Sequence, residues 1–99
     1  MTLRVNNGAR ATTIEVVGRL DSVTSPVLEK MIEKIASGTR YIVLELSGVE
    51  YVSDVGLKVL LRAHESLQTD GSLKLLGVRD SVMEIFKANG FADTFTIAR

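Results

Sequence analysis

Five consecutive residues, Ser53-Asp54-Val55-Gly56-Leu57, place a hydroxyl, a carboxylate and a glycine at the predicted start of a helix. Free backbone N–H groups and the helix dipole favour negative charge at such a position. Capping alone explains Ser53 as the N-cap and Asp54 in the first turn, which together contribute about 1 kcal/mol. Capping does not explain Gly56, since glycine in a helix costs about 1 kcal/mol relative to alanine. Either a ligand or partner approaches the backbone closely, or a contact with the sheet leaves no room for a Cβ. Both the capping and the functional interpretation stay open at this point.

Other residues that could do chemistry are few. The single histidine, His64, falls in mid-helix beside an apolar stripe, and no serine or cysteine nucleophile pattern accompanies it. We interpret it as a structural residue that is buried or packed at the edge of the core. The chain has no cysteine, no carboxylate constellation beside its histidine and no glycine-rich phosphate loop. The sequence therefore predicts no metal site, no cofactor and no enzymatic activity.

The composition is that of one small globular domain, residues 1–99. Twelve basic residues balance twelve acidic ones, so no net field draws the chain toward nucleic acid or an anionic membrane. Of the five aromatic residues, Phe86, Phe91 and Phe95 are expected in the core. No apolar run approaches the roughly 20 residues of a membrane helix, and the first residues alternate instead of forming a signal peptide. We expect a cytoplasmic protein that is a monomer or a weak dimer.

Alternating strands and helices position the Ser53–Leu57 segment. Asn7-Gly8, a dipeptide suited to positive φ, joins the first two strands as a hairpin. The segment after Gly38 is almost wholly apolar, which is typical of a strand covered on both faces. Ser47–Val52 is predicted as a connector. The predicted strands are Leu3–Val5, Thr12–Val17, Tyr41–Leu46, Leu73–Gly77 and Thr94–Ile97.

Helical periodicity predicts helices near residues 25–37, 54–69 and 80–89. Ser25 and Asp80 are the predicted N-caps of the first and third, and Asn89-Gly90 is the predicted C-cap of the third. Pro26 suits the first turn, where its missing N–H costs nothing. The predicted inner faces of the second and third helices are Leu57, Leu60, Leu61, His64 and Leu67, and Val82, Ile85 and Phe86.

This order of elements predicts an α/β fold. A strand, a helix and a strand between residues 41 and 76 require a parallel pair with a right-handed crossover. Because the N-terminal hairpin is antiparallel, we expect a mixed sheet of four or five strands with three helices packed against it. In such folds, sites form in the crevice beyond the C-terminal ends of the strands, where Ser53–Leu57 would lie.

Three segments, in order and in spacing, resemble the STAS domains of bacterial anti-sigma factor antagonists. Gly18-Arg19-Leu20-Asp21 matches the Gly-x-Leu-Asp after the second strand of that family. Val43–Leu61 is similar to its apolar strand, short loop and Gly-Leu helix start. Leu75–Val78 followed by Val82–Phe91 matches its C-terminal third. The resemblance extends over the whole chain and implies a single STAS domain.

The resemblance implies a partner-switching function. Members of the family bind an anti-sigma factor, usually a serine kinase-like protein, and so release a sigma factor. Phosphorylation at the helix N-terminus breaks the complex, and a phosphatase, expected here to be of PP2C type, restores it. Carried over to this chain, the partner-binding residues are Asp21, Ser22, Ser53, Asp54, Val55, Gly56, Leu57 and Lys58.

The sequence departs from the family at the phosphoacceptor. Counting back from Gly56-Leu57, that position holds Asp54, where a serine kinase has no hydroxyl to modify. Asp54 carries a permanent charge of −1, smaller than the −1.5 to −2 of phosphoserine. Ser53 lies one place earlier, where the family often has Asp or Ser. Three alternatives follow: a constitutive antagonist, a STAS module in another complex such as a lipid-trafficking transporter, or, least favoured, a small enzyme.

Overall fold

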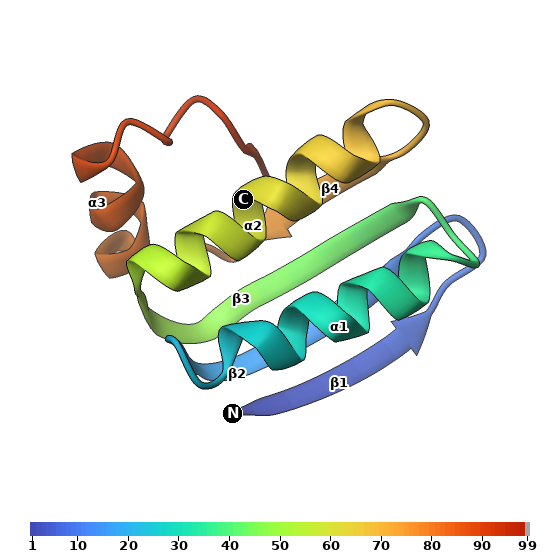
Figure 1. Ribbon diagram of the computed structural model, residues 1–99, viewed down its shortest axis with the longest axis horizontal. Coiled ribbons are helices and arrows are strands. Elements are labelled where there is room, and N and C mark those ends of the chain that lie inside the picture. The colour runs from blue at the N-terminus through green and yellow to red at the C-terminus, as the bar shows by residue number, and fades with distance from the viewer. Residues whose placement is uncertain (99) are drawn as a thin grey trace.

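The computed structural model describes residues 1–98 and has the predicted α/β architecture. The three helices within this range lie on one side of a five-stranded sheet (Figure 1). In chain order, the elements are β1 (Thr2–Asn7), β2 (Thr12–Leu20), α1 (Ser25–Ala36), β3 (Tyr41–Val52), α2 (Asp54–Gln68), β4 (Ser72–Leu76), α3 (Asp80–Ala88) and β5 (Thr96–Ala98).

The sheet is mixed, as expected from the hairpin and the βαβ unit. Its strands follow chain order from β1 to β5; β1 pairs antiparallel with β2, and all the other pairs are parallel. Each crossover moves one strand further in the same direction. Right-handed crossovers of this kind place every helix on the same face. Because β2, β3 and β4 run parallel, all three β-to-α connections also emerge at one end of the sheet, where α1 and α2 begin side by side (Figure 1).

The prediction that the central strand is covered on both faces is wrong. Ile42, Leu44 and Leu46 are buried under the helices, whereas Tyr41 is exposed on the opposite face. Val43 on that face is only partly buried, by its neighbours in register. Val43 therefore lies on the face of the sheet that no helix covers. An apolar run does not distinguish a strand covered on both faces from one covered on a single face, because side chains on adjacent strands also shield one another.

The predicted connector Ser47–Val52 is instead the second half of β3. Two register shifts against β2 mark bulges, one on each side of Gly48. Inward-facing positions therefore pass from Leu46 to Val49 and Val52, every third residue instead of every second. A Cβ on Gly48 would lie 2.9 Å from Val17 Cγ2, so the glycine permits the close pairing of the strands. The broken alternation explains why the sequence pattern looked like a loop.

Four local predictions differ from the structure. Thr24 and Arg79, and not Ser25 and Asp80, occupy the N-cap positions of α1 and α3, so each helix includes the residue predicted to cap it. Gly8 does not have a positive φ; the hairpin turn is closed by a hydrogen bond from its N–H to the Ala11 carbonyl, 2.9 Å long. The C-terminal strand starts at Thr96, two residues later than predicted.

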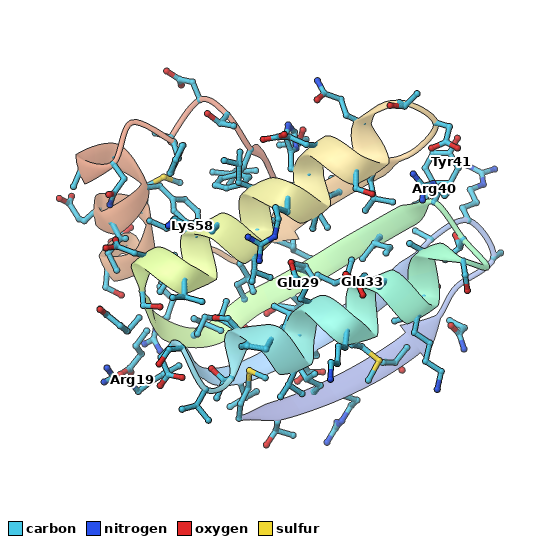
Figure 2. The ribbon with its side chains drawn as sticks, viewed as in Figure 1. Arg19, Glu29, Glu33, Arg40, Tyr41 and Lys58 are labelled. Atoms are coloured by element: carbon cyan, nitrogen blue, oxygen red, sulfur yellow. The ribbon has the colours of Figure 1, made fainter. Side chains whose placement is uncertain are left out.

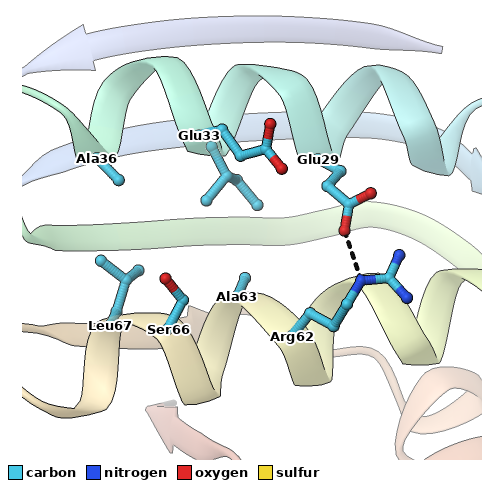
Figure 3. Close-up of a pocket in the computed structure, with 8 residues that line it drawn as sticks. Glu29, Glu33, Ala36, Arg62, Ala63, Ser66 and Leu67 are labelled. Atoms are coloured by element: carbon cyan, nitrogen blue, oxygen red, sulfur yellow. Dashed lines mark hydrogen bonds and ion pairs between the residues drawn. The ribbon is translucent and has the colours of Figure 1, made fainter.

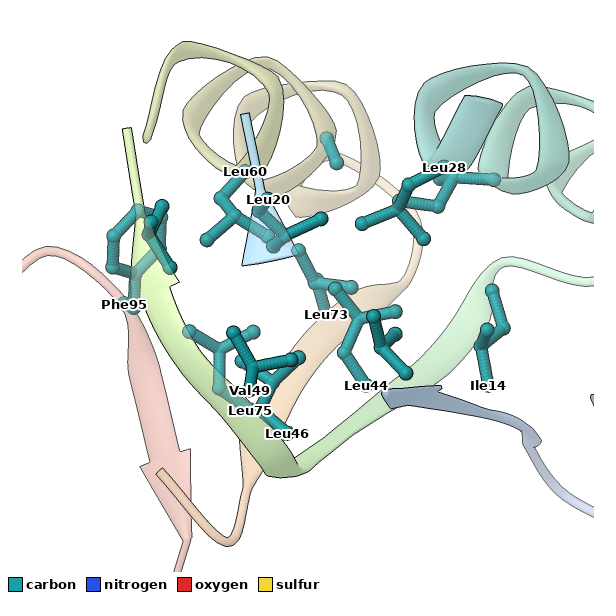
Figure 4. Packing of buried hydrophobic residues seen from close by; sticks show 14 of the residues in the cluster. Ile14, Leu20, Leu28, Leu44, Leu46, Val49, Leu60, Leu73, Leu75 and Phe95 are labelled. Atoms are coloured by element: carbon teal, nitrogen blue, oxygen red, sulfur yellow. The ribbon is translucent and has the colours of Figure 1, made fainter. Parts of the chain in front are cut away.

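One apolar core lies between the sheet and the helices (Figure 4). Phe86 of α3 is fully buried, and its ring lies 5.1 Å from that of Phe95, measured between centroids. Phe91 packs against the same cluster, which confirms the predicted core role of the three phenylalanines. Gly90, with φ of 76°, ends α3, as the Asn-Gly pair predicted.

Candidate functional site

The start of α2 is fixed by Ser53, as predicted. Its backbone is extended, and its side-chain oxygen accepts a hydrogen bond of 3.2 Å from the Gly56 N–H. Its own N–H donates to the Leu20 carbonyl over 2.8 Å, which ties the start of α2 to the end of β2. Asp54 follows in the first turn with its side chain exposed. The carboxylate is therefore presented to solvent at the positive end of a 15-residue helix.

Gly56 is explained by a contact between α2 and the sheet. A Cβ at this position would lie 2.9 Å from the Leu20 carbonyl oxygen and 2.9 Å from Val52 Cγ1. Of the two explanations that the sequence left open, the structure supports the packing contact. Gly56 and Leu57 are both buried, so they hold the first turn against the strands beneath it. They support the candidate surface from below and do not line it.

The loop between β2 and α1 is organised by Asp21. One carboxylate oxygen accepts hydrogen bonds of 3.0 Å from the N–H groups of Val23 and Thr24. The Thr24 hydroxyl accepts from the Asp21 N–H and donates to the Arg19 carbonyl. The two N–H groups that donate to the carboxylate lower the pKa of the Asp21 carboxyl, with the Thr24 N–H as the largest cause, the Val23 N–H second and the attraction of Arg19 a small addition. Asp21 therefore shapes the loop that carries Ser22.

Asp21 should make stability depend on pH. Its folded pKa lies below the ordinary value of 3.8, so its contribution is fully present above pH 3.8 and is lost as the pH falls through the lowered value. Asp21→Asn should therefore lower the free energy of unfolding at pH 7, and lower it by less at pH 3. Urea unfolding of both proteins at both pH values measures this. An equal difference at the two pH values would show that the charge of Asp21 has no part in holding the loop.

These segments together form a shallow hollow of about 520 Å³ at the end of the molecule where α1 and α2 begin. It brings together five of the predicted partner-binding residues and four residues that were not predicted for the surface. Lys58, labelled in Figure 2, lies one turn further along α2, exposed but outside the hollow. The lining residues are Arg19, Asp21, Ser22, Tyr51, Val52, Ser53, Asp54, Val55 and Ile85.

Arg19 and Tyr51 are the most informative of the residues that sequence reasoning missed. The Arg19 guanidinium carbon lies 4.6 Å from the centroid of the Tyr51 ring, a cation–π contact. The two residues are partners in the register of β2 and β3, next to the second bulge. Figure 2 shows Arg19 at the end of the molecule where the two helices start. The hollow thus combines a fixed cation, a carboxylate and apolar surface from Val55 and Ile85.

Two sequence interpretations have a defined structural outcome. His64 is partly buried, and its ring meets the Phe95 ring edge to face with centroids 5.9 Å apart, which confirms the edge-packed structural role. Ile85, predicted on the inner stripe of α3, is only partly buried and reaches the hollow.

Within residues 1–98, His, Cys, Asp and Glu side chains form no group of three that could hold a metal ion. Over the same residues, every helix is too short or too polar to cross a membrane.

Comparison with known proteins gives the family. The family model described as STAS domain matches residues 1–99. The putative anti-sigma factor antagonist BtrV of Bordetella bronchiseptica is 32% identical over 83 residues, which are 82% of this chain and 72% of BtrV. The anti-sigma-B factor antagonist of Staphylococcus aureus is 34% identical over 82 residues, which are 81% of this chain and 76% of that protein. The chain belongs to the STAS domain family.

Solved structures agree with this assignment. An anti-sigma factor antagonist from Mycobacterium paratuberculosis superposes with a TM-score of 0.85 at 28% identity, covering 97% of this chain and 83% of that one. The unphosphorylated form of the anti-sigma factor antagonist SpoIIAA superposes with a TM-score of 0.80 over 99% of this chain and 89% of that one. At 18% identity, the second likeness shows the fold alone.

Proposed function

We propose that this chain is an anti-sigma factor antagonist, a non-enzymatic module that binds an anti-sigma factor through the hollow at the start of α2. The observation that carries the proposal is the exposed Asp54 and Val55 on a first turn held rigid by Ser53 and Gly56. Related proteins from Bordetella bronchiseptica and Staphylococcus aureus bear the name anti-sigma factor antagonist. Binding of the anti-sigma factor would release a sigma factor.

Two groups that an enzymatic function could use, Asp21 and His64, have structural roles here. One carboxylate oxygen of Asp21 accepts two backbone hydrogen bonds from the loop that carries it. His64 packs its ring against Phe95. The hollow is instead a mixed surface of apolar, hydroxyl and charged groups. Such a composition suits recognition of a protein partner, because apolar contact supplies affinity and a few charges supply specificity.

Asp54 gives the interface a permanent negative charge. A partner side chain of arginine or lysine that pairs with it would form a charge-assisted hydrogen bond within the interface. The nearby Arg19 is already placed over Tyr51 and forms no ion pair with Asp54 within the described residues. The Asp54 carboxylate is therefore available to a partner. We propose that it acts as an attractive contact and not as a mimic of the dissociated, phosphorylated state.

Replacing Asp54 with serine tests this proposal. We expect Asp54→Ser to weaken binding of the anti-sigma factor from the same organism about tenfold or more, as truncation of a paired interfacial charge does. Titration calorimetry of both proteins measures the effect. Asp80→Ser is a matched control, since Asp80 is also a first-turn carboxylate but lies outside the hollow. Both variants lose a favourable helix-dipole interaction, so a loss of affinity confined to Asp54→Ser isolates the interface. Tighter binding by Asp54→Ser would make the carboxylate a built-in brake instead.

Phosphorylation should follow the same logic. Incubation with the cognate kinase and ATP is expected to give phosphate at Ser53 or none at all, because Asp54 has no hydroxyl. The Ser53 side chain already caps α2, so its modification would alter the helix start directly. Intact-mass measurement and peptide mapping decide between the outcomes. Stoichiometric phosphate at any other residue, with loss of partner binding, would place the switch elsewhere in the molecule.

A further inference from the structure

A second opening lies between α1 and α2, away from the hollow. It is a groove of about 300 Å³ with an apolar floor formed by Ile32, Ala63 and Leu67, all of them buried. Ala36 lies across the groove from Leu67, with Ser66 and Ala63 next along α2 (Figure 3). Small side chains on both helices leave space that larger ones would fill. The groove shares no lining residue with the hollow, so it is a separate feature of the surface.

The rim of the groove carries more negative than positive charge. Arg62 Nε donates to Glu29 Oε2 over 2.7 Å, and this ion pair bridges the two helices at one end (Figure 3). Glu33 lies one turn further along α1 on the same rim, and it has no hydrogen bond or ion pair within residues 1–98. The rim thus has two carboxylates and one guanidinium, and only Glu29 is paired with it. The attraction of Glu33 also contributes to raising the pKa of Arg62, after the larger effect of Glu29.

No lysine or arginine within residues 1–98 forms an ion pair with Glu33. Arg40, labelled in Figure 2, is held by Asp70 and by the backbone, with its Nε 2.8 Å from Asp70 Oδ1 and its Nη2 2.6 Å from the Ser66 carbonyl oxygen. Two of its nitrogens are therefore already engaged with Asp70 and Ser66. The groove combines an apolar channel with one carboxylate that lacks a partner. That arrangement complements a group with an aliphatic stem and a cationic end.

We propose that this groove is a docking site for a lysine or arginine side chain of a protein partner. The aliphatic stem would lie over Ile32, Ala63 and Leu67, and the charged end would reach Glu33. The volume is at the lower limit for a small-molecule cleft, which is about 300 Å³, and the groove is open along the two helices. Both facts favour a side chain presented by another protein over an enclosed free ligand. The proposal does not depend on the function of the hollow.

The probe is n-pentylammonium, which has the charge of a lysine side chain on an unbranched stem one carbon longer than that of lysine. We expect saturable amide and methyl shifts at Ile32, Ala36, Ala63 and Leu67 in NMR titrations, with a dissociation constant in the millimolar range. n-Pentanol should bind about two- to fivefold more weakly, because it lacks the charge that pairs with Glu33. Spermidine should bind less than about twofold more tightly, since the rim has only one surplus carboxylate. Tenfold tighter binding of spermidine would assign the groove to free polyamines and overturn the docking proposal.

Two variants and one control substitution give the experiment its specificity. Glu33→Gln should weaken n-pentylammonium binding about two- to fivefold, whereas Glu65→Gln, an exposed glutamate of α2 that does not line the groove, should not. Ala36→Leu should fill the groove and abolish the shifts, with folding verified by circular dichroism. Shifts that persist in Ala36→Leu, equal affinity for n-pentanol, or no saturable shifts in the wild type would each contradict the proposal. Because Asp54→Ser leaves this titration unchanged in our account, failure here is distinguishable from failure of the proposed function.

Discussion

Gly56→Ala is expected to lower the free energy of unfolding by about 1–2 kcal/mol, although alanine is the better helix former. The added Cβ would lie 2.9 Å from the Leu20 carbonyl oxygen, a backbone atom that cannot rotate away. That carbonyl also accepts the 2.8 Å hydrogen bond from the Ser53 N–H, so relieving the clash disturbs the start of α2. Overpacking costs about 1–3 kcal/mol, and contact with a fixed backbone atom favours the upper part of that range, about 2–3 kcal/mol. Subtracting the gain of about 1 kcal/mol in helix propensity leaves the expected net loss.

Chemical denaturation of the two proteins measures the effect of Gly56→Ala. Gly38→Ala is the matched control: Gly38 does not have a positive φ, and the nearest atom to a Cβ there is the Ile35 carbonyl oxygen at 3.8 Å. It should be neutral or stabilise the fold by about 0.4–1 kcal/mol. If both substitutions stabilise the protein to the same extent, the contact between α2 and the sheet does not explain Gly56.

Val55→Arg is expected to have the largest effect on partner binding, a loss of affinity of more than about tenfold. Val55 lines the hollow and is 38% exposed, so a long cationic side chain would fill the contact surface. It would also repel the partner cation that we expect opposite Asp54. The fold should tolerate the change, because the position is on the surface and costs at most about 1 kcal/mol through the helix dipole.

Calorimetric titration with the anti-sigma factor measures this loss. Val27→Arg serves as the control, since Val27 is 53% exposed on α1 and lies outside the hollow. We expect less than a twofold change in affinity for it. Thermal unfolding of both variants verifies that they are folded. Equal affinities for the wild type and Val55→Arg would show that the partner binds elsewhere on the chain.

The parts of the fold with local signals were predictable from the sequence. Ser53 marks the start of α2 because a serine immediately before a stretch with helical periodicity is favoured as the N-cap. The mixed sheet followed from the hairpin and from a single βαβ unit. Gly56 was singled out because a glycine in a first turn is costly, although the sequence could not say whether a partner or the sheet required it.

The parts that depend on contacts distant in sequence were not predictable. The second half of β3 was missed because its bulges break the period-two pattern between Leu46 and Val52. The pairing of Arg19 with Tyr51 depends on the register of β2 against β3 beyond those bulges. The groove arises where small residues of α1 and α2 face each other, and no pattern within either helix reveals that alignment.

The most direct test of the account is an amide chemical-shift map of the labelled chain on addition of the anti-sigma factor. We predict that the largest perturbations fall on the hollow, at Ser22, Ser53, Asp54, Val55 and Ile85, which come from three separate parts of the chain. Perturbations concentrated on Thr13, Val43, Lys74 and Thr96, which form one row across the open face of the sheet, would contradict it.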